Sequence, residues 1–302
     1  MCKGRSVATG INQNHKILIM KKIAVIGLGL IGGSMALELK KLTWATIYGI
    51  DNNPEHLQKA HELGLIFEKS DLNIVKEVDV VIIAVPVNAI PALTSKVLDL
   101  VEKDTLVFDV GSVKTEVCTT VANHPNRKNF VAAHPIAGTE FSGPEAAIYN
   151  LFTNKMNIIC EKDKTDASVL QKALQLFDKL EMRTTFMNPV EHDKHIAYVS
   201  HLSHISAFML GKTVLEIEPD EKNIFTMAGS GFRSTVRLAK SSPAMWTPIF
   251  MQNKQNILKS LNEYIKNLET FKELIEKNSD EDIYNIMHNT NRIKNILDGI
   301  VK

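Results

Sequence analysis

The chain has few cysteines, no long apolar run and almost no net charge. Its 302 residues include three cysteines, Cys2, Cys118 and Cys160, and their wide spacing argues against a disulfide framework or a zinc motif and favours a reducing cytoplasm. No apolar run approaches the roughly 18 residues of a membrane span. A formal net charge of +1 predicts no general attraction to nucleic acid or membranes. Any site that binds an anion by charge must therefore come from basic residues clustered in one part of the chain.

The N-terminal stretch lacks the apolar core and small-residue cleavage site of a secretory signal. The first apolar strand pattern begins directly after Met20, which we interpret as the working start. We expect residues 1–19 to be a disordered leader, residues 20–188 a cofactor-binding domain and residues 189–302 a helical domain.

A strand, a glycine-rich turn and a helix start follow Met20. Residues 23–26 read IAVI and residues 27–32 read GLGLIG. In this GxGxxG pattern the first glycine makes a tight turn, the second admits a pyrophosphate, and the third lets helix and strand pack closely. The helix N-terminus attracts the phosphates. The candidate cofactor residues of this turn are Gly27, Leu28, Gly29, Leu30, Ile31 and Gly32.

Asp51 ends the second predicted strand, residues 46–50, about twenty residues beyond the glycines. A carboxylate at this point accepts the ribose hydroxyls of NAD and repels the extra phosphate of NADP. Turn chemistry is the alternative role, because Asn53-Pro54 has the pattern of a helix start. We expect NAD as the cofactor.

Strand and helix patterns alternate up to residue 188. Further strands are predicted at 78–85, 105–110, 130–133, 156–160 and 183–187, which indicates an α/β fold with a Rossmann-type, doubly wound parallel sheet. Val85 and Pro86 end a central strand and are candidate cofactor residues.

Ser112 and His134 also follow predicted strands. Pro135 should stop the strand predicted at 130–133, because proline has no N–H for a ladder. His134 would then lie at the carboxyl end of this strand. Ligands bind at the carboxyl ends of such strands, so both residues are candidates for catalysis.

The remaining chain shows helical periodicity, which predicts an all-α C-terminal domain. Its first helix should run from Val190 to about Leu215 and carry four histidines. On one continuous helix His201 lies about 180° from His192, so the four cannot converge on a metal ion. We expect His201 and His204 to share a face, and His192 and His195 to be solvent-facing or packing residues.

Arg233, Arg237 and Lys240 form a local basic cluster. A clamp for carboxylates suits the planar fork of arginine, and a solvated helix face is the alternative. The last helices carry apolar residues that predict a homodimer. These are Ile249, Phe250, Ile257, Leu258, Leu261, Ile265, Leu268, Ile283, Ile286, Ile293 and Ile296.

Four segments occur in one order with the glycine fingerprint: GSVK at 111–114, HPIAGTE at 134–140 with Ser142-Gly143, SHLSH at 200–204, and GFR at 231–233 continuing to Arg237. Together they resemble the prephenate dehydrogenase family of tyrosine biosynthesis, from Met20 to Lys302. The HPIAGTE and SHLSH segments are far more specific than GxGxxG.

The resemblance implies NAD-dependent oxidative decarboxylation of prephenate to 4-hydroxyphenylpyruvate, CO2 and NADH. It implies that His134 accepts the hydroxyl proton and that Ser112 orients His134 or that hydroxyl. The substrate-binding residues implied are His204, Arg237, Glu140 and Thr139, with His201 in support.

The chain departs from the family pattern near Arg237. The family often has an acidic residue and a threonine where this chain has Ser234 and Val236, so the network around Arg237 can differ. We expect no fused chorismate mutase or amino-acid-sensing domain, and any tyrosine feedback should act at the active site. Alternatives are arogenate dehydrogenase, an imine or hydroxy-acid reductase, and a non-enzymatic NAD-sensing module.

Overall fold

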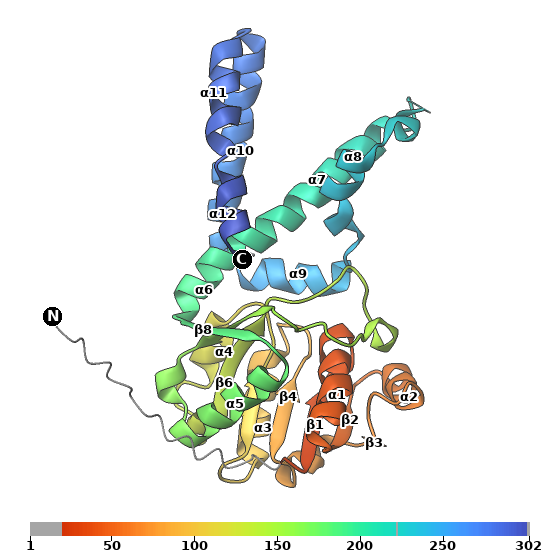
Figure 1. Cartoon of the computed structure of the whole chain (residues 1–302), viewed down its shortest axis with the longest axis vertical. Helices are drawn as coiled ribbons and strands as arrows, with labels where there is room; N and C mark the ends of the chain where they lie inside the picture. Colours follow the sequence, from red (N-terminus) through yellow and green to blue (C-terminus); the bar gives the residue numbers. More distant parts are fainter. Residues whose placement is uncertain (1–19, 222, 301–302) are drawn as a thin grey trace, which may run out of the picture.

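A computed structural model describes residues 20–221 and 223–300 of the chain (Figure 1). The predicted leader, residues 1–19, lies outside the described residues. The first part of the chain forms an α/β body, and long helices of the second part extend away from it (Figure 1). None of the helices in the described ranges combines the length and apolar character needed to cross a membrane.

The α/β body is built on one sheet of eight strands, in the order β3-β2-β1-β4-β5-β6-β7-β8. Neighbouring strands are parallel except β6 and β7, which are antiparallel. The predicted parallel sheet is therefore confirmed, with this one antiparallel pair as the exception. The strands are β1 (Lys22–Ile26), β2 (Thr46–Ile50), β3 (Glu68–Lys69), β4 (Val80–Ile83), β5 (Leu106–Asp109), β6 (Phe130–Pro135), β7 (Met156–Cys160) and β8 (Arg183–Met187).

Helices cover both faces of this sheet, as the doubly wound prediction requires. One core cluster joins the sheet to α1 and α5, and a second joins its other face to α3 and α4. All four residues of β4 are buried, as expected for a central parallel strand covered on both faces. The helices are α1 (Leu30–Thr43), α2 (Pro54–Glu62), α3 (Ile90–Leu100), α4 (Thr115–Thr120) and α5 (Ala167–Lys179).

Strand β6 ends at Pro135, as predicted, but it is two residues longer than the predicted strand 130–133 and includes both His134 and Pro135. The N–H of Ile136 donates to Met156 of β7, and successive N–H groups of a strand point to opposite sides. The missing N–H of Pro135 therefore falls on the β5 side, where pairing has already stopped at Ala132. His134 is held inside a ladder with β7 rather than in a loop.

The second part of the described chain is helical, as predicted. The expected single helix from Val190 to Leu215 is interrupted by a π-helical turn over Ala197–His201. Figure 1 shows α7 and the pair α10 and α11 projecting from the body. The helices are α6 (Pro189–Ile196), α7 (Leu202–Ile217), α8 (Ser230–Thr235), α9 (Pro243–Gln252), α10 (Lys254–Glu276), α11 (Asp280–Thr290) and α12 (Ile293–Ile300).

Helix α9 packs on the α/β body. Trp246 and Ile249 belong to the same buried cluster as residues of β4, α3 and α4, and Gln252 Nε2 donates to the carbonyl of Val87. Ile249 and Ile257, predicted to meet a partner, are instead buried within the chain at 5% exposure. Leu258, Ile265, Leu268, Ile286, Ile293 and Ile296 remain exposed, in agreement with the prediction.

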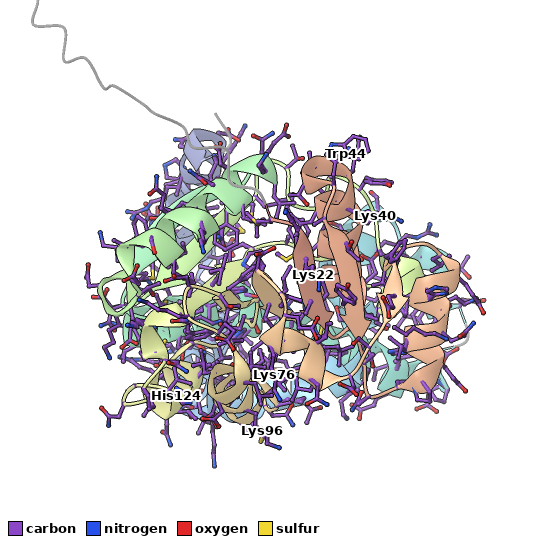
Figure 2. The ribbon with its side chains drawn as sticks, turned by 90° about the horizontal axis from the view of Figure 1, so that it is seen from below. Lys22, Lys40, Trp44, Lys76, Lys96 and His124 are labelled. Atoms are coloured by element: carbon purple, nitrogen blue, oxygen red, sulfur yellow. The ribbon has the colours of Figure 1, made fainter. Side chains whose placement is uncertain are left out.

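The edge of the sheet opposite the candidate site is seen from below in Figure 2. Lys22, the first residue of β1, marks the end at which the parallel strands begin. The glycine turn follows the other end of β1, where Ile26 is the last strand residue. The candidate site therefore lies at the carboxyl edge of the sheet.

Replacement of Ile249 by alanine tests the packing of α9. We expect the free energy of unfolding to fall by about 2–5 kcal/mol, because a buried isoleucine leaves a cavity. Ile148→Ala is the matched control, since this side chain is 44% exposed, and it should change stability by less than about 0.5 kcal/mol. Urea unfolding measures both, and equal losses in the two variants would contradict the packing.

Candidate functional site

The glycine turn has the open geometry of a dinucleotide site. Gly27 has a φ of +92°, and a Cβ there would lie 2.5 Å from the carbonyl oxygen of Ala84. A Cβ on Gly32 would lie 1.9 Å from the carbonyl oxygen of Gly27, so close packing requires both glycines. Nothing lies within 4 Å of a Cβ built on Gly29. The space above Gly29 at the start of α1 is therefore free for a ligand.

Asp51 joins the end of β2 to this turn. Its Oδ2 accepts the N–H of Leu28 at 2.8 Å, and its Oδ1 accepts the N–H of Asn53 at 2.9 Å. The side chain of Asn53 caps α2, so the predicted turn chemistry is present. The carboxylate lies next to the glycine turn, as a ribose-binding residue must.

Val85 and Pro86 follow β4 at the same edge. The backbone of Gly27 approaches that of Ala84 and Val85 closely, since a Cβ on Gly27 would be 3.0 Å from Val85 N. The strand order reverses between β1 and β4, and ligands of doubly wound sheets bind at such a switch point. These two residues therefore border the predicted cofactor crevice.

His134 is buried and belongs to a chain of hydrogen bonds. Its Nδ1 lies 2.8 Å from Nε2 of His192, and Nδ1 of His192 lies 2.8 Å from Oδ1 of Asp193. Asp193 also accepts the backbone N–H groups of Lys114 and Thr115, each at 2.8 Å. Of the two roles expected for His192, facing solvent or packing, the structure shows packing, and its contact with His134 was not predicted. His195 is exposed, in line with the prediction.

A π-helical turn follows His192 and includes His201, where the helical-wheel argument assumed one continuous α-helix. Ile196 follows His192 by four residues, about one α-helical turn, and His201 follows Ile196 by five, one π turn. All three side chains are buried, with 1%, 6% and 0% exposure. The wider turn shifts the position of His201 around the helix axis relative to a regular α-helix, and both His192 and His201 are buried. Within the described residues, no group of metal-ligating side chains could hold a metal ion.

A buried ion pair holds the backbone beneath His134. Lys114 forms an ion pair with Asp109 and donates from Nζ to the carbonyl of Ala133 at 2.7 Å. Burial raises the pKa of Asp109, and the Lys114 ammonium opposes that shift. The pair ties β5, β6 and the turn before α4 into one unit.

The hydroxyl of Ser112, in that same turn, is buried and has no hydrogen-bond partner among the described residues. It makes no hydrogen bond to His134, so its predicted role in orienting that imidazole stays a prediction. A buried polar atom without a partner is available to a ligand.

His201 and His204 both lie against Trp246. The ring of His204 stacks on the indole, with centroids 3.5 Å apart, and His201 meets it edge-on at 5.9 Å. Nδ1 of His204 donates to the carbonyl of Ser200 at 3.0 Å, which leaves Nε2 free. Nδ1 of His201 lies 3.2 Å from Nδ2 of Asn253, and Asn253 also donates to the carbonyl of Asp193 at 2.7 Å.

Arg237 and Glu140 meet across the two parts of the chain. The loop after β6 rises from the sheet toward the helical segment (Figure 1) and places Glu140 Oε2 3.5 Å from Arg237 Nη1. The Arg237 side chain is 54% exposed, so its charge is accessible. The hydroxyl of Thr139 accepts the N–H of Phe141 at 3.2 Å and shapes the same loop.

Burial lowers the pKa of three histidines of the site, His134, His201 and His204. Burial lowers the pKa of His134 well below its usual 6.5, and the nearby charges of His192 and Lys114 add to this. Burial lowers the pKa of His201 to about 4, and burial also lowers the pKa of His204. Burial alone would raise the pKa of Asp193, but hydrogen bonds from His192 and Thr115 hold it below its usual range. The site therefore contains neutral bases beside a carboxylate.

Family models cover most of the chain. Residues 35–186 match the nucleotide-binding domain of prephenate dehydrogenase, and residues 188–289 match its dimerization domain. The chain belongs to the prephenate dehydrogenase family. The predicted family, the two-part fold class and the assignment as an oxidoreductase are confirmed.

Curated relatives agree with this membership. The chain is 35% identical to prephenate dehydrogenase of Bacillus subtilis over 283 residues, which cover 92% of this chain and 76% of the relative. It is 30% identical to cyclohexadienyl dehydrogenase of Zymomonas mobilis over 261 residues, 85% of this chain and 89% of the relative.

Solved structures share the whole fold. Prephenate dehydrogenase of Aquifex aeolicus, in complex with hydroxyphenyl propionate and NAD+, is 34% identical with a TM-score of 0.84, and the match covers 93% of this chain and 99% of that one. Arogenate dehydrogenase of Synechocystis is 26% identical with a TM-score of 0.73, covering 91% and 99%.

Sequence reasoning missed five residues that hold the site together: Asp109, His192, Asp193, Trp246 and Asn253. Asp109 and Trp246 were hidden in apolar runs. The neighbouring pair His192-Asp193 offered a signal, because a buried histidine commonly donates to a carboxylate that orients it.

The pKa of His201 predicts how stability depends on pH. Since its folded pKa is about 4, the unfolded chain binds more protons below about pH 6.5. The contribution of His201 to the free energy of unfolding is therefore fully present above that pH, and it decreases as the pH falls toward 4. Between pH 7 and pH 5, His201 should account for a loss of about 2 kcal/mol.

Urea unfolding of His201→Asn at both pH values checks this. The difference in unfolding free energy between the two pH values should shrink relative to the unsubstituted protein. His195→Asn, at an exposed position, should leave it unchanged. An unchanged difference in His201→Asn would contradict the pKa assignment.

Proposed function

We propose that this chain catalyses the NAD-dependent oxidative decarboxylation of prephenate to 4-hydroxyphenylpyruvate, with CO2 and NADH as the other products. The observation that carries the proposal is the buried, neutral His134 at the carboxyl edge of the sheet, hydrogen-bonded through Nδ1 to His192. Its Nε2 is free to accept a proton. Membership of the prephenate dehydrogenase family supports the substrate class.

The cofactor is NAD, and the residues of the crevice fit it. The tight turn at Gly27, the open space above Gly29 and the N-terminus of the 14-residue helix α1 form a phosphate cradle. Each carboxylate oxygen of Asp51 accepts one backbone N–H and keeps lone pairs for ribose hydroxyls. When bound, NAD supplies the acceptor for the hydride from the substrate carbon that bears the hydroxyl. Leu28, Leu30, Ile31, Val85 and Pro86 border this crevice.

His134 supplies the proton chemistry. As the hydride leaves the ring carbon, the hydroxyl O–H bond breaks and a bond forms between the proton and Nε2, which gives a ring carbonyl and an imidazolium. Loss of the ring carboxylate as CO2 leaves its bonding electrons in the ring, which becomes a phenolate. The imidazolium then returns the proton to the phenolate oxygen. His134 is thus a general base and then a general acid, and no net proton is released. The Ser112 hydroxyl, which lacks a partner in the described protein, would orient the substrate hydroxyl.

The helical segment supplies substrate binding. Arg237 carries an accessible guanidinium steadied by Glu140, which suits a substrate carboxylate. His204, fixed by stacking on Trp246, presents Nε2 to the substrate, and His201 supports the same indole. Thr139 shapes the loop that carries Glu140. Ser234 and Val236 leave this network without the acidic residue and threonine that the family often has.

The assembly we propose is a homodimer through the helical domain, residues 189–302, with the cofactor domain over 20–188. The exposed apolar side chains of α10 to α12 are the surface that a second copy would cover. Cys118 and Cys160 are buried free thiols, which suits the reducing cytoplasm that we propose as the location.

Arogenate differs from prephenate by an amine in place of the side-chain keto group, and the same residues would serve both. The test is NADH formation with each compound, repeated with His134→Asn. We expect turnover with prephenate, and a loss of about 100-fold or more in kcat for the variant, because general-base catalysis contributes ~10²–10⁴-fold. Turnover with arogenate alone would change the substrate assignment, and normal turnover by His134→Asn would remove His134 as the proton acceptor.

Arg237→Ala tests the carboxylate contact. We expect KM for prephenate to rise with little change in kcat, because a desolvated charged contact is worth roughly 2–5 kcal/mol. Arg237→Lys keeps the charge without the planar fork and should give an intermediate KM. A fall in kcat at unchanged KM in both variants would mean that Arg237 acts on the chemical step instead.

A further inference from the structure

The chain of hydrogen bonds behind His134 is shielded from solvent along its whole length. His134, His192 and Asp193 are 7%, 1% and 2% exposed, and the rings of His134 and His192 meet at 73° with centroids 5.0 Å apart. His134 lies in β6 and His192 in α6, so this series of hydrogen bonds crosses from the α/β body to the helical segment. Water is therefore largely kept from exchanging places with these partners.

The donor and acceptor of each bond can be assigned from the Asp193 end. Asp193 accepts the N–H groups of Lys114 and Thr115, and these hydrogen bonds favour the ionised carboxylate, which can only accept. The proton between Asp193 and His192 must then reside on Nδ1 of His192. With one proton on its ring, placed on Nδ1, His192 has an acceptor at Nε2. Nδ1 of His134 must donate to it.

We propose that His192 and Asp193 are positioning residues that fix the tautomer of His134, leaving the lone pair on Nε2 for the hydroxyl proton of the substrate. The proposal rests on the proposed function, because it specifies how His134 is prepared for that proton. The arrangement follows the logic of a carboxylate that orients a catalytic histidine, here with a second imidazole between them.

A purely structural role accounts for Asp193 but not for His192. Asp193 satisfies the first N–H groups of α4, which is helix capping. His192 takes no part in that cap, and burying a polar ring is unfavourable unless both nitrogens are bonded. Both of its partners belong to the site. The burial of His192 is therefore explained by its hydrogen bonds to His134 and to Asp193 together.

The same series of hydrogen bonds stabilises the positive charge that forms when His134 takes up the proton. The charged groups around His134 are the ion pair of Lys114 with Asp109, whose ammonium lowers the pKa of His134, and Asp193, reached through His192. The histidines His192 and His201 complete the set. Asp193 is therefore the carboxylate without a counterion in this group, and through His192 its charge stabilises an imidazolium at His134. An uncharged residue at position 193, or an apolar residue at position 192 that cannot bond to both neighbours, would remove that stabilisation.

Three variants test the proposal. His192→Leu removes both bonds, and kcat with prephenate should fall about 100-fold or more, while KM and the dissociation constant for NAD stay within about three-fold. His192→Gln should recover much of kcat, because its amide N–H can donate to Asp193 and its carbonyl can accept from His134. His195→Gln is the control at an exposed position and should behave as the unsubstituted enzyme. The pH profile of kcat should shift in the leucine variant only.

Nitrogen-15 spectra of the free enzyme test the tautomer without turnover. Nε2 of His134 should be unprotonated at neutral pH. In Asp193→Asn, an amide N–H facing His192 would reverse every bond and place the proton on Nε2. Thermal unfolding and NAD binding check that each variant is folded.

The outcomes separate this proposal from the proposed function. A protonated Nε2 in the free enzyme, or an unchanged kcat and pH profile in folded His192→Leu while His134→Asn is inactive, would overturn the tautomer proposal alone. Absence of NADH formation with prephenate and arogenate would overturn the proposed function, and the spectra would still decide the tautomer.

Discussion

Three groups donate hydrogen bonds to the carboxylate of Asp193: the backbone N–H groups of Lys114 and Thr115 and the ring of His192. This one side chain therefore fixes the start of α4, the position of α6 on the α/β body and the orientation of the imidazole behind His134. Its own backbone carbonyl accepts Asn253, which ties in the segment between α9 and α10. Since a buried carboxylate is stable only when its acceptors are filled, the surrounding elements are constrained together.

The site divides its tasks between the two parts of the chain. In the proposed function, the sheet edge would hold the phosphates at Gly27–Gly32 and the ribose at Asp51, whereas His204 and Arg237 of the helical segment would hold the substrate. His134 sits between them in β6. This division requires a fixed relation between the parts, and the packing of Trp246 and Ile249 into the body supplies it by apolar burial.

Burial also sets the chemistry. His134 and His201 have lowered pKa values because the interior disfavours their charged forms. A neutral base accepts a proton but holds it weakly, which suits the proposed reaction, in which His134 would return the proton to the product within one turnover. The neighbouring carboxylate limits the cost of the transient positive charge. Removing Asp193 would thus affect both the geometry and the electrostatics of His134.

The amino-acid sequence by itself determined the glycine turn, the alternation of strands and helices, the buried strand before His134 and the family. These features are local, because strand periodicity, turn glycines and short motifs depend on neighbouring residues. Only the tertiary structure decided the antiparallel β6–β7 pair, the pairing of Glu140 with Arg237, the burial of Ile249 and the place of His192. A helical wheel assumes a uniform turn, and it did not predict the contact of His192 with His134. The π turn at Ala197–His201 packs against α10, and His201 meets Trp246 and Asn253, so this change of phase depends on packing between segments far apart in the chain.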